Sequence, residues 1–381
     1  MAKASPSLID AASWVERKIA RLRGSGRGES DDGRASAGIP ESAIDDSGGD
    51  GNGSGRRARG GSAALDRDGA TVRPAHARSG IELRRFAGPR VYRHLFTHLR
   101  VAHLTDLHVG RVTPLSVQKA AVAMAKAERP DIVVLTGDFV CHSQLYLDQL
   151  REVVCGYGVP TFAVLGNHDH WSGADEVAAA LRKAGVEVLR NRHTTIEIAH
   201  QRLQVLGLDD AYTGHARPDE AVKGLRADLP VLGLSHIAEE ADGLWRRGVP
   251  LVLAGHTHGG QVTVARLHEL ALGKIGGHKY VHGLYGSRGH LDRADGAVPR
   301  GTGAVYVGAG IGAAVMPLRL GERGRREVTT FELGTEPGTF AEHHAEQTAM
   351  PGRKPSQAVM ARRAAKVIRR RLSRERRGEP E

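Results

Sequence analysis

The sequence predicts an α/β domain in which two β-sheets pack face to face and helices cover their outer faces, a four-layer α/β/β/α arrangement. Short runs of aliphatic and β-branched residues recur through the middle of the chain, with helical patterns between several of them. Such alternation of strands and helices is typical of α/β proteins. Later strand-like segments supply a second sheet, so we expect one domain over about 95–335.

The strands expected in this domain are short and almost wholly apolar, which indicates burial on both faces. They lie at 100–105, 132–136, 161–165, 231–234 and 251–254. Apolar residues at helical spacing fill several of the intervals, and they predict helices at 115–128, 144–154 and 174–184. This order places the helices outside a parallel sheet.

The second sheet is expected from the less regular half of the domain. Segments 194–199 and 202–208 resemble an antiparallel hairpin. Further strand-like pieces lie near 261–265, 303–308 and 327–333. Residues 266–300 are rich in Gly, His, Lys and Arg and show little periodicity. Because long loops in compact domains commonly carry function, we expect this loop to cover a site.

Both ends of the chain differ from the domain in composition. Residues 1–85 are predicted to be a disordered, low-complexity region, because the stretch rich in Gly, Ser, Asp and Arg that fills most of it buries too little apolar surface to offset its ordering entropy. Within them, 7–23 has the spacing of a short amphipathic helix, either docked on a membrane or partner or solvated. Residues 336–381 are expected to be a basic, partly helical tail that binds acidic partners or only aids solubility.

The net charge of +11 belongs to these ends. Residues 353–381 hold 11 Lys/Arg against 3 Asp/Glu, residues 1–85 hold 15 against 12, and residues 86–352 hold 28 of each. Tight tracking of a nucleic-acid backbone depends on Lys and Arg contacts to phosphates. The neutral middle therefore disfavours nucleic acid as the partner of the domain.

Cysteine content and hydropathy set the expected compartment. Cys141 and Cys155 are the two cysteines, too few for a disulfide framework, and neither has the spacing of a thiolate metal site. Cys141 is expected to be a small buried residue. No run of 18 apolar residues predicts a transmembrane helix, and no secretory signal is evident. We expect a cytoplasmic protein. A second hypothesis is that this cytoplasmic protein attaches peripherally to the inner face of a membrane.

Five short polar motifs follow the predicted strands in order. They read Asp106-Leu107-His108, Gly137-Asp138, Gly166-Asn167-His168-Asp169, Ser235-His236 and Gly255-His256-Thr257-His258. The first two are weak signals alone, since such an aspartate commonly caps a turn. The last is strong, because glycines allow close backbone approach and two imidazoles can face one ion. A parallel sheet gathers its functional loops at these strand ends, so the motifs predict a metal site.

Together the motifs resemble the calcineurin-like metallophosphoesterase superfamily, whose pattern is D-x-H, GD, GNH[DE], H and GHxH. The bacterial branch is the closer likeness, on Leu135–Phe139 (LTGDF), Gly166–Asp169 (GNHD) and Gly255–Gln261 (GHTHGGQ). Gly310-Ile311-Gly312, Pro317 and Arg319 also resemble that branch. The resemblance covers about 98–333 and implies a hydrolase of phosphoric esters.

The resemblance also implies a role for each motif residue. Asp106, His108 and His258 would bind one metal, and Asn167, His236 and His256 would bind the other. Asp138 would bridge the two ions. Carboxylate, imidazole and amide ligands suit two divalent ions of Mn, Fe or Zn. An activated hydroxide would then attack phosphorus in line, without a protein nucleophile.

His168 is the residue expected over the leaving group, either as a proton donor or as a stabilising charge. Asp169 either orients the imidazole of His168 or caps a helix, and both readings stay open. The sequence departs from the branch at Ala238, where a proline is usual two residues after His236. That change leaves the ligands intact and puts the substrate preference in doubt.

The expected substrate is a small or lipid-linked phosphodiester or phosphomonoester. One alternative is a scaffold that binds partners through its basic tails without catalysis. Another is a nucleic-acid phosphodiesterase. A basic tail could also bring the protein to an anionic membrane.

Overall fold

The computed structural model describes residues 80–260, 277–289, 301–313, 319, 324–350, 365 and 369. All of them belong to one compact unit, Arg73–Glu381. The predicted helix 7–23, strand 261–265 and most of loop 266–300 lie outside the described residues, as do 1–79 and most of the C-terminal tail.

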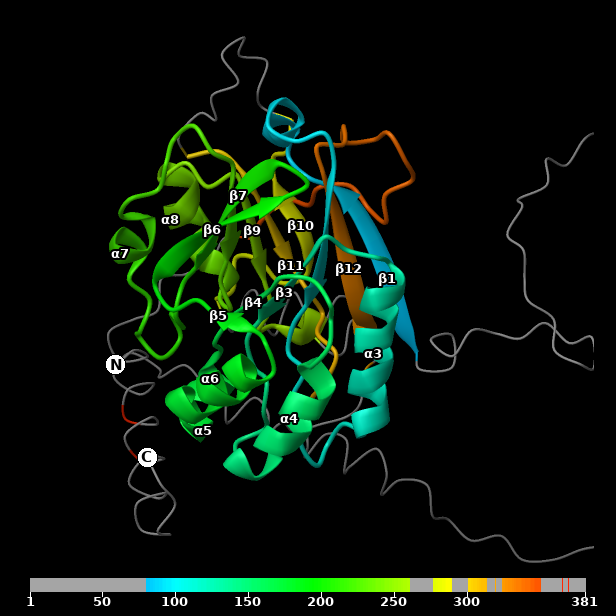
Figure 1. Cartoon of the computed structure of the whole chain (residues 1–381), viewed down its shortest axis with the longest axis vertical. Helices are drawn as coiled ribbons and strands as arrows, with labels where there is room; N and C mark the ends of the chain where they lie inside the picture. The colour runs from blue at the N-terminus through cyan, green and yellow to red at the C-terminus, as the bar shows by residue number, and fades with distance from the viewer. Residues whose placement is uncertain are drawn as a thin grey trace, which may run out of the picture. The chain divides into compact units, whose positions relative to one another are not determined.

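The described part of the chain forms two six-stranded mixed sheets (Figure 1). The first sheet has the order β1-β12-β2-β3-β4-β5. Its strands are β1 (Ile81–Ala87), β12 (Arg326–Leu333), β2 (Leu99–Leu104), β3 (Ile132–Thr136), β4 (Thr161–Val164) and β5 (Glu187–Val188). β12 runs antiparallel to β2, whereas β2 to β5 pair in parallel.

The second sheet has the order β10-β11-β9-β8-β7-β6. Its strands are β10 (Gly283–Gly286), β11 (Ala304–Val307), β9 (Leu251–Ala254), β8 (Val231–Leu234), β7 (Gln201–Gly207) and β6 (Arg192–Ile198). β11, β9, β8 and β7 are parallel, and the predicted hairpin is the antiparallel pair of β6 and β7. The second sheet therefore has a parallel centre and an antiparallel pair at each edge, whereas the antiparallel pair of the first sheet, β12 with β2, lies inside it.

The interior between the sheets comes from alternate residues of the strands. Val101 and Val134 point into this interior, while Ala102 and Val133 pack towards the helices on the other face. The strands are apolar on both faces because both faces are covered, which is why they read as continuous apolar runs.

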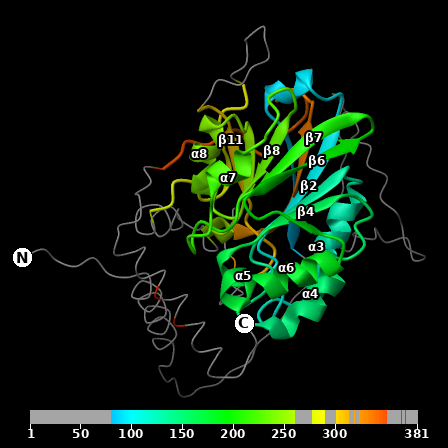
Figure 2. The same cartoon turned by 60° about the vertical axis from the view of Figure 1, so that its left-hand side comes forward.

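Helices cover the outer faces of the two sheets. On the first sheet lie α3 (Leu115–Ala127), η2 (Gln144–Tyr146), α4 (Leu147–Val154) and α6 (Ala174–Lys183). On the second lie α7 (Pro218–Val222), η3 (Ala238–Glu240) and α8 (Ala241–Arg246). Figure 2 shows these two groups on opposite sides of the strands, so the four-layer prediction is confirmed. Three short helices complete the described elements: η1 (Arg90–His94), α5 (Asn167–Ser172) and η4 (His258–Gly260).

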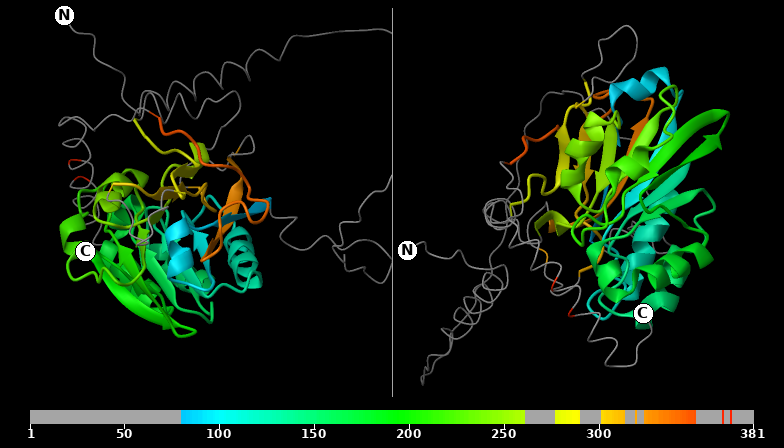
Figure 3. Two further views of the ribbon diagram at one scale, coloured as in Figure 1. Left: turned by 90° about the horizontal axis from the view of Figure 1, so that it is seen from above. Right: turned by 90° about the vertical axis from the view of Figure 1, so that its left-hand side faces the viewer.

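The boundaries expected at the ends of the domain need correction. Residues 81–85, expected within the disordered region, belong to β1, which pairs in parallel with β12 (Figures 1 and 3). Strand 327–333, expected in the second sheet, is β12 of the first. Arg84, in the middle of β1, is buried against Glu327, a partner 243 residues away in the sequence. Residues close to Arg84 in the sequence give no indication of so distant a partner, so the sequence did not predict β1.

The C-terminal limit at residue 335 is also too short. Residues 336–350 reach the edge of the second sheet, where Gln347 forms a parallel bridge with Tyr285 of β10. Arg288, 3% exposed, donates to the carboxylates of Glu342 and Glu346. These residues were expected to belong to the tail, but their buried contacts make them part of the fold.

Among the described residues, none of the helices has the length and apolar character needed to cross a bilayer.

Candidate metal centre

The five motifs lie at the carboxyl ends of parallel strands from both sheets. Asp106 follows β2, Asp138 follows β3, and Asn167 follows β4 at the start of α5. His236 follows β8, and His256 follows β9 in the second sheet. The predicted placement of the motifs at strand ends is therefore confirmed. The ends meet because the sheets pack with these edges together.

Five of the candidate ligands have left-handed backbone conformations. Their φ values are 51° at Asp106, 43° at His108, 54° at Asp138, 76° at His256 and 53° at His258. Such conformations are uncommon outside glycine and cluster at functional sites.

The first cluster consists of Asp106, His108, Asp138 and His258. His108 Nε2 lies 3.1 Å from His258 Nε2, and Asp138 Oδ2 lies 3.5 Å from His108 Nε2. Asp106 Oδ1 is 3.4 Å from His258 Nε2. Four potential ligand atoms thus converge on one point.

The second cluster consists of Asp138, His236 and His256. His236 Nε2 lies 3.4 Å from Asp138 Oδ2 and 3.3 Å from His256 Nδ1. His236 Nδ1 lies 2.7 Å from the carbonyl oxygen of Thr136 and donates to it, so Nε2 is the ring nitrogen that faces the other candidate ligands. Asp138 belongs to both clusters and joins them.

The donor atoms of these clusters fit divalent cations. Asp106 Oδ1 and Asn167 Oδ1 are buried without a hydrogen-bond partner in the described part of the chain. Buried polar atoms are normally paired, so two unpaired oxygens beside facing imidazole nitrogens indicate an ion. A Cβ on Gly166 would lie 2.3 Å from Asp138 Oδ1, so the backbone approaches this carboxylate as closely as only glycine allows. Oxygen and imidazole donors suit Mn²⁺, Fe²⁺ and Zn²⁺.

Burial sets the charge of most of these groups. It lowers the pKa of His108 to about 4 and holds the pKa values of His256 and His258 well below the ordinary value. Burial raises the pKa of Asp106 to about 7. Burial also opposes the charge of His236, but the Asp138 carboxylate raises the pKa of His236 to about 10. The imidazoles of His108, His256 and His258 are therefore neutral, which is the form that binds cations.

Comparison with known proteins agrees with this geometry. Residues 99–260 match the family described as calcineurin-like phosphoesterase. The phosphodiesterase YaeI of Escherichia coli (strain K12) is 32% identical over 242 residues, which are 61% of this chain and 82% of that protein. The chain belongs to the calcineurin-like phosphoesterase family.

Other relatives give the same result. The uncharacterized metallophosphoesterase YkuE of Bacillus subtilis (strain 168) is 27% identical over 63% of this chain and 80% of its own. An uncharacterized metallophosphoesterase of Aquifex aeolicus (strain VF5) is 34% identical over 43% of this chain and 64% of its own. The protein is a phosphoric ester hydrolase, and its Asp and His clusters imply divalent metals.

The two residues expected to assist catalysis in this phosphoesterase have different surroundings. His168, the second residue of α5, lies beside the clusters: its backbone amide donates to Asp138 Oδ1 at 2.8 Å, and its ring Nε2 lies 4.0 Å from Asp138 Oδ2. Asp169 contacts the backbone of two neighbouring loops. It accepts from the amides of Phe139 at 2.8 Å and Gly166 at 2.9 Å. The contacts of Asp169 are those of a helix cap and loop tie rather than of a group that orients His168.

Four residues that the motifs do not contain also lie at the site. The ring of Tyr212 is 5.2 Å from that of His256, and the ring of Trp171 is 4.8 Å from that of His168. The ring of His278 is 5.5 Å from that of His256. Arg319 Nη2 lies 3.4 Å from His258 Nδ1. Arg319 had a sequence signal through the resemblance of its segment to the family, and His278 lies in the loop 266–300 that was expected to cover a site.

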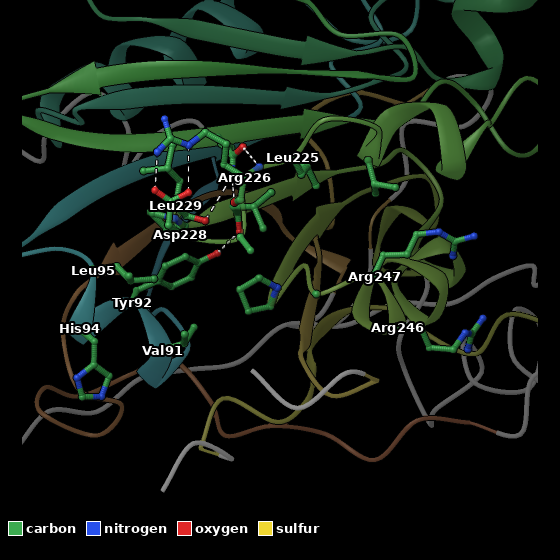
Figure 4. A pocket seen from close by; sticks show the side chains of 17 residues that line it. Val91, Tyr92, His94, Leu95, Leu225, Arg226, Asp228, Leu229, Arg246 and Arg247 are labelled. Atoms are coloured by element: carbon green, nitrogen blue, oxygen red, sulfur yellow. Dashed lines mark hydrogen bonds and ion pairs between the residues drawn. The ribbon is translucent and has the colours of Figure 1, made fainter. Parts of the chain in front are cut away.

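A cavity of about 880 Å³ lies at the other end of the second sheet, where β8 and β9 begin (Figure 4). Its walls include Tyr92, Leu229 and Arg246, and no candidate ligand lines it. The Tyr92 hydroxyl donates to the carbonyl of Val231, and Arg226 pairs with Asp228. These polar groups therefore bind other groups of the protein.

Proposed function

We propose that this phosphoesterase hydrolyses small phosphodiesters or phosphomonoesters at a dinuclear metal centre. One observation carries the proposal: the Asp138 carboxylate is shared by two clusters of buried ligand atoms. Asp106, His108 and His258 would hold one ion with it, and Asn167, His236 and His256 the other. Two such ions, when bound, would activate a water and neutralise charge on the phosphoryl oxygens.

His168 would act on the leaving group. Burial holds the pKa of His168 well below the ordinary value, so its ring is neutral and carries one proton. Its ring Nδ1 is buried without a partner among the described residues. The neutral ring can therefore donate a hydrogen bond to the departing oxygen, and it could protonate that oxygen only from its imidazolium form. The family resemblance of Gly166–Asp169 supports this role.

The proposed substrate class rests on two supports. The E. coli relative is named a phosphodiesterase. The segment 86–352 carries equal numbers of basic and acidic residues, which favours a small ester over a nucleic acid. A lipid-linked ester fits the same chemistry.

The test uses purified full-length protein, stripped of metal and then supplied with Mn²⁺, Fe²⁺ or Zn²⁺. Bis-p-nitrophenyl phosphate and p-nitrophenyl phosphate should both be assayed. Asp138→Asn and His256→Ala should reduce turnover to near background. Asp148→Asn and His200→Ala, at side chains 94% and 99% exposed, are matched controls and should leave turnover unchanged. Wild-type rates in Asp138→Asn would refute the shared-carboxylate assignment.

We also propose that residues 353–381 bring the enzyme to anionic membranes, in keeping with their excess of basic residues. The full chain should sediment with vesicles that contain an anionic lipid, and a chain ending at residue 350 should not. Equal turnover of the two proteins on a soluble ester would separate attachment from catalysis. Absence of sedimentation at low salt would remove the membrane proposal and leave the hydrolase intact.

A further inference from the structure

The loop Ala309–Gly312, which follows β11, lies against the first ligand motif. The amide of Ile311 donates to the carbonyl of Thr105 at 3.1 Å, and the amide of Gly312 donates to the carbonyl of Asp106 at 2.7 Å. A Cβ on Gly312 would lie 2.1 Å from the carbonyl oxygen of Leu107. The loop therefore fixes the backbone of Thr105, Asp106 and Leu107 at very close range.

Three charged side chains hold this loop in turn. Arg319 donates from Nη1 to the carbonyl of Ala309 at 2.7 Å and from Nη2 to the carbonyl of Gly312 at 2.6 Å. Arg326 Nε donates to the carbonyl of Ile311 at 2.9 Å. Glu327 accepts from the amide of Ala309 at 2.8 Å.

Glu327 is itself firmly anchored. This carboxylate is 2% exposed, and Arg84 Nε lies 2.7 Å from it. His282 Nε2 lies 3.0 Å away, and the hydroxyl of Tyr306 donates to it at 2.8 Å. One end of the loop is thus fixed to the interior, while Arg319 ties the two ends of the loop together.

We propose that Arg319 is a positioning residue for one of the two metals, the ion bound by Asp106, His108 and His258. It spans Ala309 and Gly312, and the loop so held maintains the left-handed conformations of Asp106 and His108. Its guanidinium also lies beside His258 Nδ1. The inference rests on the proposed dinuclear centre.

The shape of the side chain matters more than its charge here. A planar guanidinium presents several N–H donors in a rigid fork and can bind two carbonyls at once. A lysine ammonium at the same place would keep the charge but could not hold both carbonyls in this geometry. Arg319→Lys therefore separates the two roles.

The experiment measures metal binding by isothermal titration of the metal-free full chain with Mn²⁺. Arg319→Met and Arg319→Lys should each bind one of two ions about 10- to 100-fold more weakly, as is usual when a group that supports a ligand is lost. The second ion should keep its affinity. Arg325→Met is the matched control, because the neighbouring Arg325 pairs with Glu82 at the surface and does not touch the loop.

Different outcomes would contradict the positioning role of Arg319 and the dinuclear metal centre on which it rests. A wild-type chain that binds no Mn²⁺, Fe²⁺ or Zn²⁺ would overturn the metal centre itself. Two ions of unchanged affinity in both Arg319 variants would overturn only the positioning role. Wild-type affinity in Arg319→Lys alone would assign the effect to charge and contradict the role proposed. Should Arg319→Met fail to unfold cooperatively, Arg319→Lys supplies the test, and unchanged affinity there would contradict the role proposed.

Discussion

Asp138 connects the chemistry of the whole site through its two carboxylate oxygens. Oδ1 accepts the amide hydrogen of His168, and Oδ2 faces the imidazoles of His108 and His236. His236 holds the positive charge that balances this carboxylate in the metal-free protein. A divalent ion would take over that balance, since ligand imidazoles bind metals in the neutral form.

His168 can be separated from the metal ligands by the choice of leaving group. His168→Ala should leave metal stoichiometry unchanged and lower turnover of an alkyl phosphodiester by roughly 10²- to 10⁴-fold. The loss should be smaller for p-nitrophenyl esters, because p-nitrophenolate leaves without a proton. Turnover of both esters should be measured with saturating Mn²⁺. An equal loss for both esters would contradict a proton-donor role.

His103 should make the stability of the enzyme depend on pH. It is 2% exposed, its Nε2 lies 2.8 Å from Thr136 Oγ1, and burial lowers its pKa to about 4 from an ordinary value of 6.5. The unfolded chain binds the extra proton between these values. Stability is therefore full above pH 6.5 and falls as the pH drops towards 4.

Acidification from pH 7 to 5 should remove about 2 kcal/mol through His103 alone. His103→Gln should reduce the pH dependence of the free energy of unfolding by that amount, as measured by urea titration of the metal-free protein at both pH values. His200→Gln, at an exposed site, should leave the dependence unchanged. Identical slopes for wild type and His103→Gln would show that the imidazole titrates normally.

At the scale of elements, the site depends on ties between the loops that follow β3 and β4. Asp169, buried at the start of α5, accepts from Phe139 in one loop and from Gly166 in the other. The two loops carry Asp138 and Asn167 respectively. Asp169 therefore fixes the spacing of two candidate ligands.

Asp169→Ala should destabilise the protein by roughly 3 kcal/mol, because it leaves buried amides without acceptors, and should also weaken metal binding. Asp131→Ala is the control: Asp131 accepts from the amide of Arg100 at 2.6 Å, just before β3 and away from the ligands. It should lower stability while metal affinity stays at the wild-type value. Denaturant titration and metal titration together check both parts. Unchanged metal affinity in Asp169→Ala would limit the residue to a purely structural cap.

The elements that position the ligands were predictable because their strands are apolar on both faces. β3, β8 and β9 have the predicted bounds, since each is a run of buried aliphatic residues that ends abruptly at a polar motif. β1 and β10 had no such signal. β1 contains Arg84, which is buried against Glu327, and β10 contains two glycines. Residues beside the candidate ligands, such as Tyr212, reach the site through the geometry of their loops. The spacing of residues in the sequence does not reveal that geometry.

At the scale of the whole molecule, segments that are distant in sequence pair at the edges of the two sheets. β1 and β12 pair along one edge, and residues 336–350 pack along β10 at the edge of the other sheet. The amide of Met350 donates to the carbonyl of Lys279, and Gln347 Nε2 donates to the carbonyl of His282. These contacts tie the end of the domain to the segment that carries His278, beside His256.

Glu342 should therefore contribute strongly to stability although it lies beyond the motif-bearing part of the chain. Its carboxylate takes two hydrogen bonds from Arg288 and is 11% exposed, so Glu342→Ala leaves a buried guanidinium with one fewer partner and should cost roughly 3 kcal/mol. Glu336→Ala in the same segment should cost less than about 1 kcal/mol, because Glu336 pairs with the exposed Arg93 and the partly exposed Arg90. Urea titration of both variants measures the difference. Equal, small effects would mean that residues 336–350 are an appendage, and the domain limit would return to residue 335.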